Sequence, residues 1–390
     1  MIFPRLKILS FFLLLAFVLE EQGCVSFQQE KISFKKTTYN HLAGWKQAHL
    51  LTILPVFKNS CQALLKKNHN HTLLNGFVIK DMHNVCSQII SFGDNLKEVE
   101  FKKYIEDYFT PYKVHYGHND TGLFTGYYIP ILKGSMIKTS FYNIPVYARP
   151  KDLVVIEDLS VFRSGHGFKN KRIAGTVQNG RLVPYYTRKD IEEGSIAKKG
   201  YELLWVHDPI MLYLMQVQGS GIIDTIQGTK FVLGYDGTNG HEYVSIGKII
   251  TQEDKSVKRS QVSLKLIKNW LKHHPEIAKT IMRKNKSYVF FKKMPDNQIV
   301  GSQGTGLYPM RSLAVDTAYI PLGLPIWLNI KNKDTPIQTL VISQDTGGAI
   351  KGPIRGDLYC GIGNSAEKLA GNLKDLGEYY ILIPKSVSLK

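Results

Sequence analysis

Two aspartates separated by a glycine-rich segment are the residues of this chain best placed to do chemistry. Asp345 follows an apolar run at residues 340–342, and Asp357 ends the glycine-rich segment. A glycine-rich connection can present an acidic side chain to a substrate without obstruction by its neighbours. Because carboxyl groups act as general acids and bases, the two aspartates could divide those roles, or one could hold the other in place.

Polar and aromatic side chains elsewhere in the chain fit a sugar substrate. Aromatic rings pack against sugar faces, hydroxyl and amide groups bond sugar hydroxyls, and a partly buried carboxyl can protonate a glycosidic oxygen. Asp316 could join that site or bond backbone amides at a strand end, and Asp345 could act directly or support Asp357. The candidates with this chemistry are Thr125, Tyr127, Tyr128, Gln218, Ser220, Asp316, Asp345 and Asp357.

Other common catalytic motifs are incomplete in this sequence. Ser220 lacks the glycine two positions before it that a nucleophile elbow requires. Gly247-Lys248 lacks the rest of a phosphate-binding loop. His241-Glu242 is not followed by the second histidine of a zinc-binding helix. We therefore predict no metal site and no cofactor.

Strands must position these candidates, because alternating apolar residues and frequent turn residues dominate after residue 122. Residues 122–130 form an aromatic, strand-like run closed by proline. Helix-like patterns cover residues 41–51, 60–67 and 97–108, and two amphipathic helices are predicted at 263–272 and from Pro275 to about residue 283. Strands are predicted at 288–291, 314–317, 325–330, 339–343 and 379–383, with a short helix at 364–371, and a closed barrel would satisfy the strand edges.

The composition is that of a globular protein, and the start of the chain indicates export. With 390 residues, 43% of them hydrophobic, the chain can bury a sizeable core, in two domains. Residues 1–23 have the charged start and short apolar run of a secretory signal peptide. Cys24 closes that segment as a lipidation site would, although Glu21 and Gln22 are atypical there. Acylation of Cys24, a plain cleaved signal and an uncleaved anchor are the open alternatives.

Export also bears on the cysteines and on the charge. Disulfides form outside the cytoplasm, so Cys61 and Cys86 are the predicted pair. Cys360 has no histidine within ten residues and is interpreted as a buried, packed thiol. The formal charge of +18 predicts an anionic partner, which for an exported protein is cell-wall polymer or an anionic membrane surface rather than nucleic acid.

Several motifs occur in the order found in one known family. Three of them are Phe124-Thr125-Gly126-Tyr127-Tyr128, Val217-Gln218-Gly219-Ser220-Gly221 and the segment from Asp345 to Asp357. In this series the chain resembles the membrane-bound lytic murein transglycosylase A family from about residue 61 to residue 384. Ile129 and Asp236 depart from the family pattern, so neither is interpreted as catalytic.

The resemblance implies a mainly β fold with helical segments. It would consist of a double-psi β-barrel built from the N- and C-terminal parts, a second β-rich domain inserted between those parts, and a groove between the two domains. The expected boundaries are a signal peptide at 1–23, a helical lead-in with the first part of the barrel at 24–134, the inserted domain at 135–286, and the C-terminal part of the barrel with the catalytic loop at 287–390.

The resemblance also implies a peptidoglycan lytic exotransglycosylase, which is a carbon–oxygen lyase acting on a polysaccharide. It would cleave the β-1,4 bond between N-acetylmuramic acid and N-acetylglucosamine and leave 1,6-anhydromuramoyl ends, with Asp357 as the single acid and base and Asp345 close by. A two-carboxylate peptidoglycan hydrolase using Asp345 and a non-catalytic murein-binding protein stay open as alternatives. The substrate-binding positions would be Thr125, Gly126, Tyr127, Gln218, Gly219, Ser220, Asp316, Gly347 and Gly348.

The expected partners and location follow from the same resemblance. Peptidoglycan glycan strands are the expected partner, contacts with cell-wall synthesis proteins are compatible with it, and no nucleic acid is expected. The location would be the periplasm, with attachment to the outer membrane only through a lipid on Cys24.

Overall fold

The structure, a computed structural model, describes residues 31–74, 77–162, 172–332 and 335–389. The predicted signal peptide and Cys24 lie outside these ranges. Within them, no helix is both long enough and apolar enough to cross a membrane.

Six strands close into a barrel around the main hydrophobic core. Ile326, Trp327 and Leu328 of one strand are fully buried, as expected of a strand covered on both faces. The strands follow the order β5-β18-β15-β17-β16-β19, and the ring closes because β19 pairs with both β16 and β5. This is the predicted double-psi β-barrel. Its strands are β5 (Gly122–Ile129), β15 (Ser312–Val315), β16 (Pro325–Ile330), β17 (Ile337–Asp345), β18 (Gly356–Ile362) and β19 (Lys374–Pro384).

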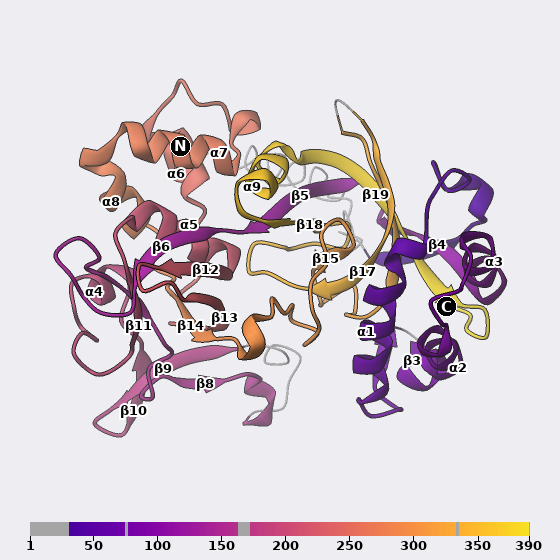
Figure 1. Cartoon of the computed structure of the whole chain (residues 1–390), viewed down its shortest axis with the longest axis horizontal. Coiled ribbons are helices and arrows are strands. Elements are labelled where there is room, and N and C mark those ends of the chain that lie inside the picture. The colour runs from indigo at the N-terminus through magenta and orange to yellow at the C-terminus, as the bar shows by residue number, and fades with distance from the viewer. Residues whose placement is uncertain (1–30, 75–76, 163–171, 333–334, 390) are drawn as a thin grey trace, which may run out of the picture. The chain divides into compact units, whose positions relative to one another are not determined.

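Helices precede the barrel and lie beside β4 in Figure 1. The disulfide between Cys61 and Cys86 joins α1 to α2, which confirms the predicted pair. The prediction of a helix at residues 41–51 is wrong, because the backbone becomes extended at Leu42 after a single 3-10 turn. The elements are β1 (Ile32–Lys36), η1 (Tyr39–His41), η2 (Leu51–Ile53), α1 (Leu54–Leu65), β2 (Thr72–Leu74), β3 (Phe77–Val78), α2 (Ile79–Ser91), α3 (Glu98–Tyr108) and β4 (Phe109–Tyr116).

The inserted part begins directly after β5, since Pro130 alone separates β5 from β6. Its larger sheet has the order β14-β13-β12-β6-β11-β7, and its smaller sheet has the order β10-β9-β8. The larger sheet contains β6 (Ile131–Ser135), β7 (Ile144–Tyr147), β11 (Glu202–Val206), β12 (Ser220–Thr225), β13 (Lys230–Thr238) and β14 (Val289–Lys293). The smaller sheet contains β8 (Val154–Ile156), β9 (Ile173–Gln178) and β10 (Arg181–Pro184), and η3 (Leu159–Val161) follows β8.

Helices of the insert pack around their own apolar cluster, which includes Trp270, Leu271 and Ile281. The two predicted amphipathic helices are confirmed as α7 and α8. Ser263 begins α7 because its side chain accepts a hydrogen bond from the Leu266 amide, and Pro275 occupies the first turn of α8. The insert helices are α4 (Arg188–Glu192), α5 (Pro209–Gln218), α6 (Ile246–Glu253), η4 (Arg259–Gln261), α7 (Leu264–His273) and α8 (Pro275–Arg283), and η5 (Pro295–Asn297) follows β14.

Helix α9 (Gly363–Asn372) covers β5 and β18 and connects the barrel with the insert. Gly126 of β5 permits this packing, because a Cβ atom there would lie 2.8 Å from both the Ala370 Cα and the Cys360 Sγ. On its other side α9 contacts α7, where Lys268 and Glu367 form an ion pair at 2.5 Å. The helix therefore fixes the backbone of the strand that carries Thr125.

Candidate active site

One row of residues across four neighbouring barrel strands brings the predicted acids together. Asp345 of β17 lies opposite Ala314 of β15, Ala314 lies opposite Asp357 of β18, and Asp357 lies opposite Thr125 of β5. Residues in register on adjacent strands point to the same face of a sheet. Leu358, the residue after Asp357, belongs to the main core, so Asp357 and the residues in register with it face away from that core.

The strand that carries Asp357 corrects the sequence-based expectation of a catalytic loop. Asp357 is the second residue of β18 and is paired on both sides, whereas Asp345 is the last residue of β17. Only residues 346–355 form the connection between them. Both acids are therefore held by strand pairing rather than by a free loop.

Asp357 has the electrostatic surroundings of a proton donor. It is half-buried, and its Oδ1 accepts a hydrogen bond from Thr125 Oγ1 at 2.6 Å. Burial, with a smaller contribution from Asp345, raises the pKa of Asp357 to about 6, while Arg355 and Thr125 oppose that rise. Its other oxygen, Oδ2, has no hydrogen bond to any described residue. An acid with these properties is part protonated near neutral pH.

Asp345 has the surroundings of a structural acceptor. Its Oδ1 accepts from the Ser302 amide (3.0 Å), the Ser302 hydroxyl (2.7 Å) and the Thr346 amide (2.9 Å). Its Oδ2 accepts from the Tyr127 hydroxyl at 2.9 Å. Burial raises the pKa of Asp345, and these donors oppose that rise. Both oxygens are therefore already engaged.

Ser302 was missed by sequence reasoning, and a buried polar chain holds its segment in place. Gln344 Nε2 donates to Thr305 Oγ1 at 2.8 Å, and Gln303 Nε2 donates to Ser60 Oγ of α1 at 2.8 Å. These side chains are buried, so each bond satisfies a group that would otherwise lose its water. The glycine-rich run at 301–306 is typical of a turn, but nothing in its sequence shows a contact with Asp345.

The other predicted substrate-binding positions have separate locations. Asp316 is buried after β15, where its carboxylate accepts from the amides of Ala318 (3.2 Å) and Gly352 (2.8 Å) and so holds the 346–355 connection. Gln218 Oε1 accepts from the Tyr128 amide at 3.0 Å, at the junction between β5 and the insert.

Four further predicted positions are glycines or lie beside one. Gly219 ends α5 with a positive φ of 80°, and Ser220 begins β12. Gly347 and Gly348 lie in the connection after β17, and nothing within 4 Å would meet a Cβ atom at Gly348. A role of these positions in substrate binding stays a prediction.

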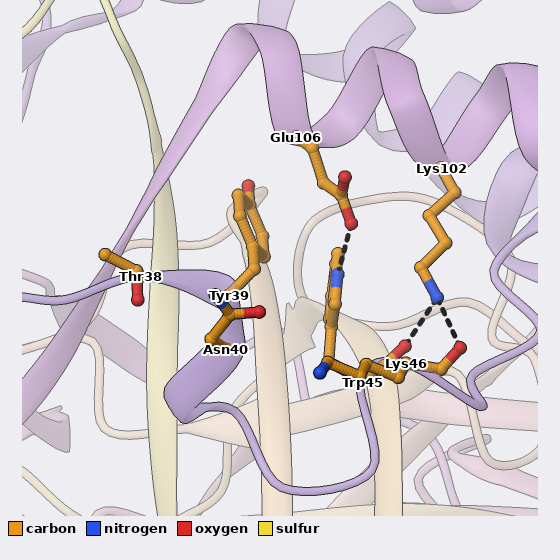
Figure 2. A pocket seen from close by; sticks show the side chains of 7 residues that line it. All are labelled: Thr38, Tyr39, Asn40, Trp45, Lys46, Lys102 and Glu106. Atoms are coloured by element: carbon orange, nitrogen blue, oxygen red, sulfur yellow. Dashed lines mark hydrogen bonds between the residues drawn. The ribbon is translucent and has the colours of Figure 1, made fainter.

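A surface cavity of about 480 Å³ is lined by residues of the N-terminal part of the described chain and by neither of these acids (Figure 2). Its polar groups bond one another. Glu106 Oε1 accepts from the Trp45 indole at 2.7 Å, and Lys102 donates to the carbonyls of Trp45 (2.6 Å) and Lys46 (2.8 Å). These contacts fasten α3 to the segment after β1, so we assign the cavity a structural role. Its lining is Thr38, Tyr39, Asn40, Trp45, Lys46, Lys102 and Glu106.

Comparisons with known proteins find similarity to one family. The profile of the MltA specific insert domain matches residues 123–292, and that of the 3D domain matches residues 311–383. Membrane-bound lytic murein transglycosylase A of Vibrio cholerae is 32% identical over 273 residues, and the homolog of Buchnera aphidicola is 32% identical over 267 residues. Over these segments the chain is similar to the membrane-bound lytic murein transglycosylase A family. These alignments cover 67% and 66% of this chain and span 65% of each relative's length.

Solved structures of similar proteins share the fold of this chain. A membrane-bound lytic murein transglycosylase from Agrobacterium tumefaciens superposes with a TM-score of 0.80 at 24% identity, covering 91% of this chain and 98% of that one. The 3D-domain match contains the strands of Asp345 and Asp357, and the insert-domain match begins within β5, the strand of Thr125. The row of site residues therefore joins the two family segments.

Proposed function

We propose that this protein is a peptidoglycan lytic transglycosylase in which Asp357 is the only acid and base. The observation that carries the proposal is the contrast between the two aspartates. Asp357 has a raised pKa of about 6 and one oxygen without a hydrogen bond among the described residues. Asp345 has both oxygens engaged by donors. Only one of the two carboxyls is thus available for proton transfer.

The reaction needs one carboxyl group used twice. Protonated Asp357 donates its proton to the oxygen between N-acetylmuramic acid and N-acetylglucosamine as the C1–O bond breaks. The carboxylate then takes the proton of the muramoyl C6 hydroxyl as that oxygen bonds to C1. The products are a free N-acetylglucosamine hydroxyl and a 1,6-anhydromuramoyl end, and Asp357 returns to its protonated form. Since the nucleophile belongs to the same sugar, the second step is intramolecular and consumes no water.

The spacing of the strands argues against a two-carboxylate hydrolase. Asp345 and Asp357 are separated by one intervening strand, so their backbones lie about 9 to 10 Å apart, at about 4.8 Å per strand. A retaining glycosidase needs its carboxyls only about 5 Å apart. An inverting enzyme tolerates a larger separation, but its base must be free to activate a water molecule, and the four hydrogen bonds to Asp345 occupy it.

The proposed substrate is the glycan strand of peptidoglycan. The Escherichia coli relative, 29% identical over 268 residues, has a crystal structure with bound chitohexaose, a chain of sugars. For this protein we propose that Thr125, Tyr127 and the glycines of the 346–355 connection lie along the bound strand. A charge of +18 would favour association with an anionic wall polymer, so that binding should weaken as the salt concentration rises. We propose a periplasmic location, with membrane attachment only through a lipid on Cys24.

The experiment is product analysis by mass spectrometry after incubation of the purified protein with intact peptidoglycan. The proposal expects anhydro-ended muropeptides from the wild type and none from Asp357→Asn. The matched control is Asp107→Asn, which alters a surface aspartate paired with Lys103 at 2.9 Å and should release anhydro ends at the wild-type rate. Hydrated ends would instead identify a hydrolase. No release, together with binding to the wall, would identify a murein-binding protein.

A further inference from the structure

Arg355 holds the hydroxyl group that contacts the proposed acid. Its Nη2 donates to Thr125 Oγ1 at 2.7 Å, and its Nη1 donates to the carbonyl oxygens of Leu123, at 3.2 Å, and of Gly356. Thr125 Oγ1 lies 2.6 Å from Asp357 Oδ1. Arg355 therefore reaches Asp357 through Thr125.

The direction of the Thr125 hydroxyl follows from the chemistry of its two partners. A guanidinium group has donors and no acceptor, so the bond to Arg355 uses the Thr125 oxygen as an acceptor. The single hydroxyl hydrogen must then point to another acceptor, and the bonded one is Asp357 Oδ1. An acid proton on Oδ1 would face that hydrogen. The proton of Asp357 is therefore placed on Oδ2.

We propose that Arg355 is the positioning residue of this site: by fixing the direction of the Thr125 hydroxyl, it makes Asp357 Oδ2 the oxygen that carries and delivers the acid proton. The role in catalysis rests on the proposed transglycosylase function, whereas the placement of the proton does not. In both steps of the reaction Oδ2 exchanges the proton with substrate. The bond from Thr125 to Oδ1 stays unchanged throughout.

The groups around Asp357 act on it in opposite directions. Arg355 and Thr125 favour the carboxylate, while burial and the negative charge of Asp345 favour the protonated acid. Tyr127 and Cys360 stay uncharged near neutral pH, since burial raises the pKa of the Tyr127 phenol further and that of the Cys360 thiol to about 12. Loss of Arg355 would remove a positive charge and also free Thr125 to accept a proton from Asp357.

Four variants separate these effects. Arg355→Met should raise the titration midpoint of Asp357 by about one pH unit, because the opposite charge is lost. It should also lower the plateau that kcat reaches at low pH by about fivefold, because in part of the molecules the acid proton would be donated to Thr125 rather than to substrate.

The other three variants are comparisons. Arg355→Gln keeps a donor without the charge, so the midpoint should rise while the plateau is largely retained. Thr125→Ser should behave as the wild type, and Thr125→Val should raise the midpoint.

The combination of Arg355→Met with Thr125→Val tests whether Arg355 acts through Thr125. In the Thr125→Val background the hydroxyl group that would take the acid proton is absent, so Arg355→Met should cause little further loss of plateau rate there. A loss of about fivefold on adding Arg355→Met to Thr125→Val, or an Arg355→Met protein with an unchanged plateau and midpoint, would overturn the proposal.

Two measurements keep this test separate from the proposed function. The midpoint is read by carbon-13 NMR of labelled aspartate carboxyls in the resting protein, with the Asp357 signal assigned from Asp357→Asn. That titration needs no turnover, so it reports on Arg355 even if the wild type releases no anhydro product. Circular dichroism of each variant verifies its fold, and Arg355→Gln provides the answer if Arg355→Met does not fold.

Discussion

The raised pKa of Asp357 predicts that replacing the acid stabilises the protein at neutral pH. The pKa rises from its usual value of 3.8 to about 6 on folding, mainly through burial. Below the unfolded value both states are protonated and the group has no effect on stability. As the pH rises toward 6 the unfolded chain ionises first, so the free energy of unfolding falls and then stays low above 6.

The size of this effect follows from the difference between the two pKa values. One unit of pKa difference corresponds to about 1.4 kcal/mol. The difference between the folded and unfolded pKa values of Asp357 therefore lowers the free energy of unfolding by about 3 kcal/mol above pH 7 and by about 1 kcal/mol at pH 4.5. Asp357→Asn removes the titrating group but keeps an oxygen that can accept from Thr125. We therefore expect the variant to exceed the wild type in free energy of unfolding by about 1 kcal/mol at pH 4.5 and about 3 kcal/mol at pH 7.5.

Urea unfolding followed by tryptophan fluorescence measures this difference. Trp45 and Trp327 are buried in the core of the barrel and its N-terminal helices, so their emission reports on the part of the molecule that contains the site. Asp107→Asn is the control and should change stability by less than about 0.5 kcal/mol at either pH. A gain that is equal at both pH values, or no gain at pH 7.5, would refute the assignment of a raised pKa to Asp357.

Three further substitutions test the packing and the hydrogen bonds of the site and of the insert. Gly126→Ala should reduce the free energy of unfolding by about 1–3 kcal/mol in urea, because its Cβ atom would collide with α9; Gly348→Ala, where the space is open, should change little. Arg188→Met should reduce it by at least about 2 kcal/mol, since the buried carbonyls of Asn285 and Ser287 would lose their donor, whereas the exposed Arg181→Met should not. Tyr127→Phe removes a donor from Asp345, so the pKa of Asp345 should rise in a carbon-13 NMR titration of the labelled carboxyls, while Tyr359→Phe should leave it in place. Equal behaviour of a variant and its control would contradict the corresponding contact.

Elements with a local pattern could be predicted from the sequence. Strand β5 and helices α7 and α8 were predicted because an alternating aromatic run, a capping Ser263 and a first-turn Pro275 lie within the elements themselves. The disulfide was predicted because export leaves Cys61 and Cys86 as the nearest pair. Cys360 is buried and free, as interpreted from its neighbours in the sequence.

The surroundings of the acids could not be predicted in the same way. Strand β18 is missing from the predicted strands, and Asp357 is predicted in a loop, because the strand follows a glycine-rich segment and pairs with strands far away in the chain. Thr125 and Asp357 are 232 positions apart, and Ser302 and Asp345 are 43 apart. Hydrogen bonds over such separations depend on the closure of the barrel, which leaves no mark on the local sequence of either partner.

The central claim is that one aspartate cleaves the glycan without water, and digestion of intact peptidoglycan in oxygen-18 water tests it most directly. The account predicts that mass spectrometry will find anhydro-ended muropeptides that contain no oxygen-18, and that Asp357→Asn will release none of them. Muropeptides with oxygen-18 at their new reducing ends would contradict it, because a water molecule would then have completed the reaction.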